Sequence, residues 1–328
     1  MAFTGSSGAT PRLTRRTVLT GAAALLAGAA VPAAKPARAA ANPQIYAAAA
    51  GWTGYGGELL VLTGEAETDH ALRVLEPAES AGTVTGVLGP PLPLPLPDGF
   101  VPHSMAATGA TLWVTGAREL GPDRAVPALV RIDGAAGEYV DLPVPDSIRS
   151  GIATAVTPLG TGLAVAVEGG PDEHLTVLSR SHLAITADGR AWTEQELAAG
   201  LGEGYGTVLA ETDRGLFAAV ADGAGTQSAF TGRLAEAAVP RLVLTAAGTV
   251  ANAGRPMAAV AADAYVSLYS DRDGVITETR YTGDERTETA FGGTTGDCAC
   301  LGEVLAVPGR RGLWLETDGT TIHIRGNR

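Results

Sequence analysis

The chain has 328 residues, of which 45% are hydrophobic and 18% charged. This balance excludes an intrinsically disordered chain and supplies enough apolar side chains for a sizeable core. Its 44 glycines and 20 prolines, placed between short apolar runs, favour many strands joined by many turns. The net charge of −12 argues against nucleic acid as a partner, because an acidic surface repels phosphate backbones.

The first 39 residues have the features of an export signal. Arg15 and Arg16 precede a weakly apolar stretch over residues 21–32, and Ala37 and Ala39 form an A-x-A cleavage pattern. This is the three-part layout of a secretory signal. The paired arginines and mild apolar core resemble the twin-arginine class, which implies that the twin-arginine machinery exports the folded protein. An ordinary Sec signal and a retained membrane anchor are the alternatives.

Cleavage of this leader, residues 1–39, leaves a single domain over residues 40–328. The leader holds five basic residues and no acidic one, so the rest has 18 basic against 35 acidic residues and a net charge near −17. We expect a secreted or extracytoplasmic protein. We also expect no stable membrane span after cleavage, because no second apolar run is long enough to cross a bilayer.

The mature region repeats one apolar segment six times. The anchor residues of these segments are Leu59, Leu112, Leu163, Leu216, Tyr265 and Leu313, with spacings of 53, 51, 53, 49 and 48 residues. A period near 50 residues, with about four short strands in each repeat, is typical of propeller blades. We therefore predict an all-β β-propeller with six blades of about four antiparallel strands. Seven blades or a two-sheet β-sandwich are the alternatives.

The surroundings of the apolar segments repeat as well. A strand of small residues precedes five of them, at residues 104–108, 152–157, 207–211, 257–261 and 304–307, and residues 47–50 are the candidate equivalent in the first repeat. Small residues suit the innermost strand, where blades crowd around the axis. Asp-Gly pairs follow at residues 133–134, 188–189, 222–223, 273–274 and 318–319. Since Asp-Gly is a strong hairpin signal, we expect these turns to join the second and third or the third and fourth strands of a blade.

Three segments depart from the repeating strand pattern. The proline-rich run Pro90–Pro97 cannot form a central strand, so we predict an extended connector between the first two blades. Residues 194–201 could form one or two helical turns. The sixth repeat ends after about three strands, and we expect residues after Asn42 to supply its missing outer strand, because an open ring would leave unpaired edges.

One turn carries a resemblance to a known family. The segment that contains Thr186, Asp188, Gly189 and Trp192 resembles the Asp-box of sialidase-like propellers, although residue 191 is alanine where the family has threonine. In that family the box stabilises a turn between outer strands, away from the active face, so the resemblance implies a fold and no activity. The family's arginine in the first blade is not matched, since Arg73 stands in a different setting.

Cys298 and Cys300 are the only cysteines of the chain. An exported protein favours disulfide formation, but a bridge across one residue closes a small, tense ring that geometry often forbids. As thiolates, the pair could bind a soft metal such as Cu(I) or Zn(II) with help from a histidine. A local disulfide, unpaired thiols and a metal site all stay open, and no cofactor is otherwise identified.

Single polar residues near the inner strands are the remaining candidates. His103 precedes an inner strand and could face the axis. Glu168, Glu211 and Asp263 end or follow predicted inner strands, and if they converged on one face they could carry out glycoside chemistry. An ordinary loop histidine and solvated acids are the simpler interpretations.

The chain carries no catalytic motif, neither a zinc-binding H-E-x-x-H helix nor a G-x-S-x-G elbow. This favours a non-catalytic propeller that binds a glycan, peptide or protein partner in the cell envelope or outside the cell. The Asp-box resemblance keeps a glycan-active hydrolase or lyase as one alternative. A metal- or cofactor-binding propeller that uses Cys298 and Cys300 is the other, since fold alone licenses no activity.

Overall fold

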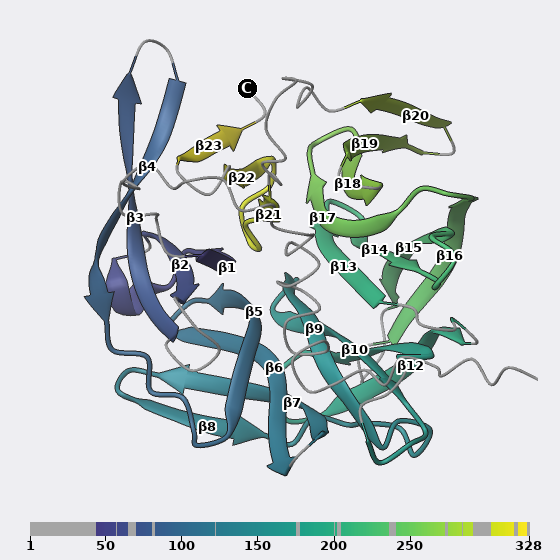
Figure 1. Cartoon of the computed structure of the whole chain (residues 1–328), viewed down its shortest axis with the longest axis horizontal. Coiled ribbons are helices and arrows are strands. Elements are labelled where there is room, and N and C mark those ends of the chain that lie inside the picture. Colours follow the sequence, from purple (N-terminus) through teal and green to yellow (C-terminus); the bar gives the residue numbers. More distant parts are fainter. Residues whose placement is uncertain are drawn as a thin grey trace, which may run out of the picture.

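The computed structural model describes residues 44–326, except residues 57, 65–69, 81–82, 122, 175–177, 200, 202–204, 236–240, 273–274, 284, 291–302 and 318–320. The described residues form 23 β-strands and one short 3₁₀ helix, η1 (Thr53–Tyr55). The strands surround a common axis as the blades of a β-propeller (Figure 1), which confirms the predicted all-β fold, and their number fits six blades. Within these residues, no helix has the length and apolar character needed to cross a membrane.

Each of the first five blades has four strands that follow one another along the chain. Blade 1 contains β1 (Gln44–Ala50), β2 (Leu59–Gly64), β3 (His70–Ser80) and β4 (Thr83–Leu92), and blade 2 contains β5 (Phe100–Thr108), β6 (Thr111–Gly121), β7 (Arg124–Asp133) and β8 (Ala136–Val140). Blade 3 contains β9 (Ser150–Leu159), β10 (Gly162–Gly170), β11 (Arg180–Thr186) and β12 (Trp192–Ala199), and blade 4 contains β13 (Tyr205–Thr212), β14 (Gly215–Ala221), β15 (Gln227–Ala235) and β16 (Arg241–Val250). Blade 5 contains β17 (Arg255–Ala261), β18 (Val266–Arg272), β19 (Val275–Thr282) and β20 (Glu285–Ala290), and blade 6 contains β21 (Glu303–Ala306), β22 (Leu313–Thr317) and β23 (Ile322–Gly326).

The core lies between neighbouring blades. Successive side chains of a strand point to opposite faces of its sheet, so each blade packs one face on the preceding blade and the other on the next. On β10, Val165 clusters with Trp113 of blade 2, whereas Ala166 clusters with Leu209 of blade 4. The repeating apolar segments form the second strand of each blade, and β10 is buried along its whole length.

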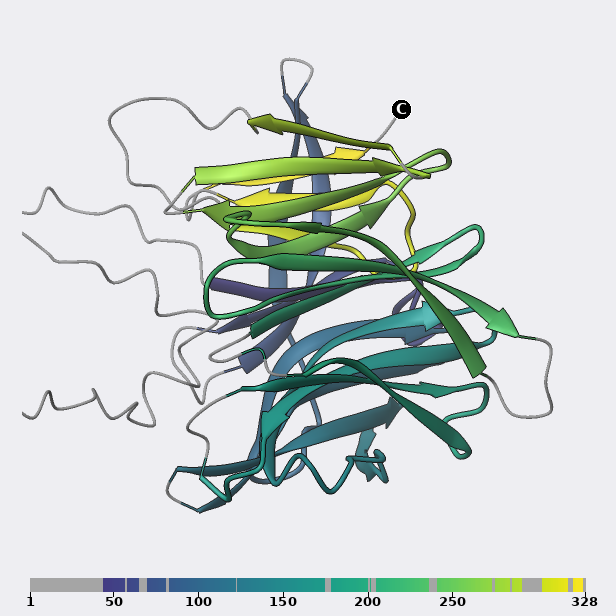
Figure 2. The same ribbon diagram turned by 90° about the vertical axis from the view of Figure 1, so that its right-hand side faces the viewer.

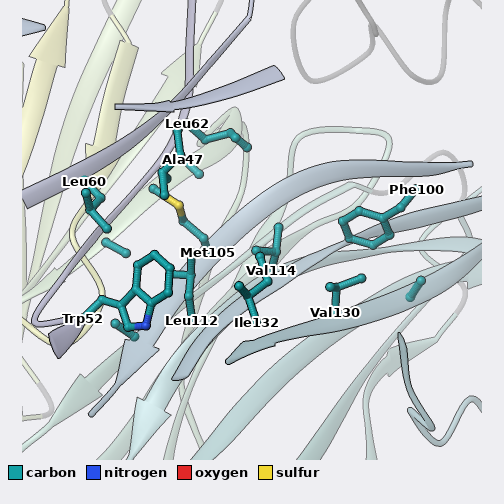
Figure 3. Packing of buried hydrophobic residues seen from close by; sticks show 14 residues of the cluster. Ala47, Trp52, Leu60, Leu62, Phe100, Met105, Leu112, Val114, Val130 and Ile132 are labelled. Carbon is teal, nitrogen blue, oxygen red and sulfur yellow. The ribbon is translucent and has the colours of Figure 1, made fainter. Parts of the chain in front are cut away.

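The interface of blades 1 and 2 shows this packing in detail (Figure 3). Trp52 follows β1 and lies against Leu60, Met105 and Leu112, all buried. Its indole N–H donates to the carbonyl oxygen of Ala110 over 2.7 Å. The contact therefore joins the two blades through both apolar burial and a directed hydrogen bond.

Ring closure differs from the prediction. Residues just after Asn42 form β1, the innermost strand of blade 1, and do not complete blade 6. The outer neighbour of β23 is instead β4, which pairs antiparallel with it through Ile322 with Gly86 and His323 with Thr85. A bulge between Arg73 and Leu75 lies within the long β3–β4 hairpin, and the hairpin reaches past blade 1 toward β23 (Figure 1).

An apolar cluster supports this closure. Leu75 of β3 is buried with Ile45 and Val61 of blade 1 and with Leu315 and Ile322 of blade 6. Burial of several large aliphatic side chains is worth more than the two strand pairs between β4 and β23 can supply. The seam between first and last blades is thus held mainly by side-chain packing.

Two local predictions are also revised. Residues 194–201 were expected to be helical, but residues 192–199 form β12 because they pair with β11.

In the proline run, Pro90 and Pro91 belong to β4, and Pro91 lies opposite Arg73. Proline is tolerated in β4 because β4 is the outermost strand of its own blade. Residues 93–99 form the predicted connector to blade 2.

The Asp-Gly turns lie where the repeat predicts them. Residues 133–134 join β7 to β8, residues 188–189 join β11 to β12, and residues 222–223 join β14 to β15. The Asp222 carboxylate accepts the backbone N–H groups of Ala224 and Thr226 over 2.9 and 2.8 Å. The pairs at 273–274 and 318–319 lie outside the described residues.

Candidate functional site

All inner strands run in the same direction along the axis, so their first residues gather at one end of the ring. We call this end the start face. It is defined by Gln44, Phe100, Ser150, Tyr205, Arg255 and Glu303, the first residues of β1, β5, β9, β13, β17 and β21. The connections from second to third strands lie at the same end, because Gly170 pairs with Ser150 and Ala221 with Tyr205. Figure 2 shows the blades from the side, with their strands running between the two ends.

Five of the inner strands carry a β-bulge close to the start face. The extra residue is Tyr46 in β1, His103 in β5, Thr154 in β9, Gly206 or Thr207 in β13, and Met257 in β17. The described part of β21 pairs with β22 without a register shift. A bulge turns a side chain out of the regular alternation and is common next to functional sites. We call these five positions the bulge ring.

The bulge of β13 is held by a carboxyl group from the neighbouring blade. Glu168 of β10 is 1% exposed, and it accepts the backbone N–H groups of Gly206, over 3.2 Å, and of Thr207. The Thr207 hydroxyl also forms a 2.8 Å hydrogen bond with the Ser181 hydroxyl. Two backbone donors of blade 4 therefore converge on one carboxyl group.

The electrostatics of Glu168 combine opposing effects. Burial raises its pKa above the ordinary range and outweighs the hydrogen bonds from Thr207 and Gly206 and the positive charge of Arg255, which all lower it. The side chain is fixed by its donors at the junction of blades 3 and 4. It is therefore placed to stabilise the bulge.

Arg255 brings a positive charge to the same level. Its side chain lies over Gly206, where an added Cβ would come within 3.2 Å of Arg255 Cγ. Gly206 has a φ of +89°, a conformation that favours glycine. The charge of Arg255 acts on Glu168 of blade 3 and also on His103 of blade 2.

His103 lies at the bulge of β5. It keeps part of its surface open to solvent and is otherwise densely surrounded by protein, as expected for a side chain beside the axis. Burial, with a smaller contribution from the positive charge of Arg255, lowers the pKa of His103 to about 4. The imidazole is therefore neutral at pH 7 and offers one N–H donor and one acceptor nitrogen.

Thr154 is a further polar residue of the bulge ring. It is 9% exposed, and its hydroxyl is buried with no hydrogen-bond partner within the described structure. Buried hydroxyl groups normally have a hydrogen-bond partner. A bound molecule or an ordered water at the bulge would supply this partner for Thr154.

The three predicted acids do not converge. Glu168 lies toward the start face, near the end of the second strand of blade 3. Glu211 lies near the end of the inner strand β13, and Asp263 follows the inner strand β17. Because consecutive antiparallel strands end at opposite faces, Glu211 and Asp263 lie at the other end of the ring. The proposed grouping of these acids is therefore wrong.

The Asp-box-like residues form a hydrogen-bonded turn between β11 and β12. The Thr186 hydroxyl accepts the Gly189 N–H over 2.9 Å, and the Asp188 carboxylate accepts the N–H groups of Arg190 and Ala191, each over 2.9 Å. These two bonds lower the pKa of Asp188. Trp192 begins β12 and packs against the core shared by blades 2 and 3. The turn lies at the end opposite the start face.

Several predicted residues lie outside the described residues: Cys298, Cys300, Arg15, Arg16, Ala37 and Ala39. No group of three or more potential metal ligands occurs in the part of the chain that the structure describes. Arg73 lies on β3, the third strand of its blade, and donates to Gly89 and Thr63.

The comparisons with known proteins show the fold. A comparison with protein-family models found no match, and neither did one with curated proteins. Among solved structures, the chain is similar to the PQQ-bound form of aldose sugar dehydrogenase from Streptomyces coelicolor, with a TM-score of 0.52, 14% identity, and coverage of 89% of this chain and 98% of that one. It is also similar to the Cps50 (Swd1) β-propeller domain from Myceliophteria thermophila, with a TM-score of 0.51, 15% identity, and coverage of 87% and 83%.

Proposed function

We propose that this chain is an exported, non-catalytic β-propeller that binds a ligand at the start face, beside the bulge ring. The observation that carries this proposal is the state of Glu168. The carboxyl group is buried and accepts two backbone N–H groups from blade 4. A general acid or base must reach the reacting atoms, and a glycosidase needs a second carboxyl group opposite the first. Glu211 and Asp263 lie at the other end of the ring.

The remaining groups suit recognition. The neutral imidazole of His103 and the Thr154 hydroxyl, which has no partner among the described residues, lie at the bulges of two neighbouring blades. Ligand sites typically combine an apolar surround with a few polar groups that converge from separate elements. The alanine-rich inner strands supply that surround.

Export through the twin-arginine route is part of the proposal. It is supported by Arg15 and Arg16, the mild apolar stretch and the A-x-A pattern at Ala37 and Ala39. We expect the double variant Arg15→Lys, Arg16→Lys to retain uncleaved precursor inside the cell, measured by fractionation and immunoblotting. Normal export of this variant, together with loss of export when the general secretory route is disabled, would contradict export by the twin-arginine route.

Binding is tested with the mature domain, residues 40–328, on arrays of glycans and peptides. We expect ligands that are lost in the variant His103→Ala and retained in Glu211→Gln, which changes the opposite face. A parallel screen with chromogenic glycosides tests the enzyme alternative. Turnover that disappears in Glu168→Gln would overturn the non-catalytic proposal, and binding that survives His103→Ala unchanged would place the site elsewhere.

A further inference from the structure

We infer that the chain has a second binding site, for an uncharged sugar, at the outer part of the junction between blades 5 and 6. These blades are neighbours in the ring (Figure 1). The site lies toward the end opposite the start face, where β18 and β22 begin, because Tyr265 directly precedes β18 and Trp314 is the second residue of β22. At this end the Gly312 N–H donates to the Ala261 carbonyl oxygen over 2.7 Å and joins the two blades. The site is separate from the bulge ring and goes beyond the proposed function.

The junction combines aromatic and charged side chains. Tyr269 of β18 and Trp314 of β22 are in contact across it, with ring centroids 5.9 Å apart. Residues paired on adjacent strands lie on the same face of a sheet. Glu278 of β19 is paired with Tyr269, so it faces this junction from blade 5. Arg325 of β23 is paired with Trp314 and faces it from blade 6. The aromatic contact is therefore flanked by a charged residue on each side.

Arg280 of β19 is held in one orientation by two contacts. Its Nε and one terminal nitrogen donate to the two oxygens of Glu278 over 2.7 and 3.3 Å, and its guanidinium carbon lies 5.0 Å from the centroid of the Tyr265 ring. The Ser267 hydroxyl fixes the same carboxylate by donating to it over 2.6 Å. The Arg280 side chain is 50% exposed, and Glu278 uses two of the five N–H groups of the guanidinium. The other three have no hydrogen-bond partner in the described part of the chain.

Trp314 adds a donor from blade 6. Its indole N–H is buried and has no hydrogen-bond partner among the described residues, although buried N–H groups normally have one. Beside it, Arg325 Nε donates to Glu316 Oε2 over 3.1 Å, and these two side chains are 40% and 30% exposed. An oxygen atom of a ligand would complete the hydrogen bonding of Trp314.

These groups favour an uncharged sugar over an ion. Each arginine is neutralised by the carboxylate that it binds, so the two pairs have no net charge. The available groups are of both kinds: donors on Arg280 and Trp314, and an acceptor in the second oxygen of Glu316. A sugar hydroxyl group both donates and accepts hydrogen bonds, and the apolar C–H face of a sugar ring packs on an aromatic side chain.

The test is isothermal titration calorimetry of the mature domain, residues 40–328, with three uncharged trisaccharides: maltotriose, cellotriose and mannotriose. Trigalacturonate is the charged counter-probe and trialanine the peptide counter-probe. We expect at least one uncharged trisaccharide to bind at least about 10-fold more tightly than both counter-probes. Absence of binding by all three up to about 10 mM, or tighter binding of a counter-probe, would overturn the inference.

Two variants locate the site, and two matched controls change similar groups elsewhere. Arg280→Gln and Trp314→Phe should each weaken binding about 5-fold or more. Arg131→Gln breaks an exposed ion pair with Asp133 in blade 2, and Trp192→Phe removes a buried indole N–H without a described partner in blade 3. Each control should change binding less than about 2-fold, because distant sites act independently. Circular dichroism and thermal unfolding confirm that each variant is folded.

Tryptophan fluorescence gives an independent readout. The chain has four tryptophans, and a sugar that covers Trp314 shields it from water and should shift its emission to shorter wavelength. At saturating ligand, this shift should vanish in Trp314→Phe and persist in Trp192→Phe. Binding that both Arg280→Gln and Trp314→Phe leave unchanged would overturn the inference. His103→Ala should not affect it, so a trisaccharide whose binding is lost in His103→Ala would support the proposed function and overturn this second site.

Discussion

Replacement of Glu168 by glutamine tests the central structural feature of the site. The carboxyl group accepts two backbone N–H groups from blade 4, one on each oxygen, at 1% exposure. An amide of the same shape has one acceptor oxygen and turns an NH₂ donor toward the other side. One of the two N–H donors then faces another donor and stays unpaired. An unsatisfied buried donor costs about 1–3 kcal/mol.

The cost converts into a measurable change in melting temperature. In a domain of this size class, each kcal/mol lowers the Tm by roughly 2–4 °C, so Glu168→Gln should lower it by roughly 2–12 °C at pH 7. Differential scanning calorimetry of the mature domain, at one scan rate for all variants, measures this directly. Glu168→Ala should lower the Tm further, because it removes the acceptor for both N–H donors and leaves a cavity.

The matched control is Glu211→Gln. Glu211 also accepts a backbone N–H from the neighbouring blade, that of Gly160 over 3.1 Å, but at an exposed site. Water can replace this bond, so we expect a change in stability within about 0.5 kcal/mol. Equal shifts in Tm for the two glutamine variants, or a higher Tm for Glu168→Gln, would refute the idea that Glu168 holds the bulge of β13.

Three further predictions follow from local geometry. Burial raises the pKa of Glu168 above that of the unfolded chain, so its contribution to stability is full at acid pH and is lost as pH rises through the raised pKa. The difference in unfolding free energy between wild type and Glu168→Gln, measured by urea unfolding, should therefore shrink with rising pH. A difference that grows with pH would contradict a raised pKa for Glu168. Gly206→Ala should cost about 1–3 kcal/mol in the same assay, because φ is +89° and the new Cβ would lie 3.0 Å from a carbonyl oxygen of blade 5; an unchanged midpoint would show that the bulge adapts. At the ring closure, Gly86→Ala places a Cβ 2.5 Å from Leu75 Cδ1, whereas Gly89→Ala on the same strand has its nearest atom at 3.4 Å, so the first variant should lose at least about 1 kcal/mol more than the second.

The blade repeat could be predicted because apolar side chains recur in it at a regular spacing. Apolar anchors such as Leu112 and Leu216 recur about every 50 residues, and each became the second strand of a blade. Second strands such as β10 and β14 are buried on both faces, so their composition is tightly constrained. Ring closure was mispredicted for the opposite reason: two strand pairs between β4 and β23 leave no periodic signal.

The site was predicted only in part. His103 was singled out because it precedes an inner strand. Arg255 was missed, because an arginine after a glycine and before a proline has the pattern of an ordinary turn residue. The role of Glu168 depends on the register of β13, where a single extra residue directs two N–H groups toward the neighbouring blade. Register between blades is a property of the assembled ring, and no pattern within one strand encodes it.

The bulge ring nevertheless has a signal that can be read in the sequence. Inner strands need small side chains because six blades crowd around the axis, and small side chains carry little chemistry. Regular alternation sends every residue of such a strand between blades, so a functional group beside the axis requires a break in the alternation. That break falls on tyrosine at 46, histidine at 103, threonine at 154 and methionine at 257, each followed by alanine or serine. In these four inner strands, the bulge residue is thus larger or more polar than the residue after it, and each bulge residue is a candidate ligand contact.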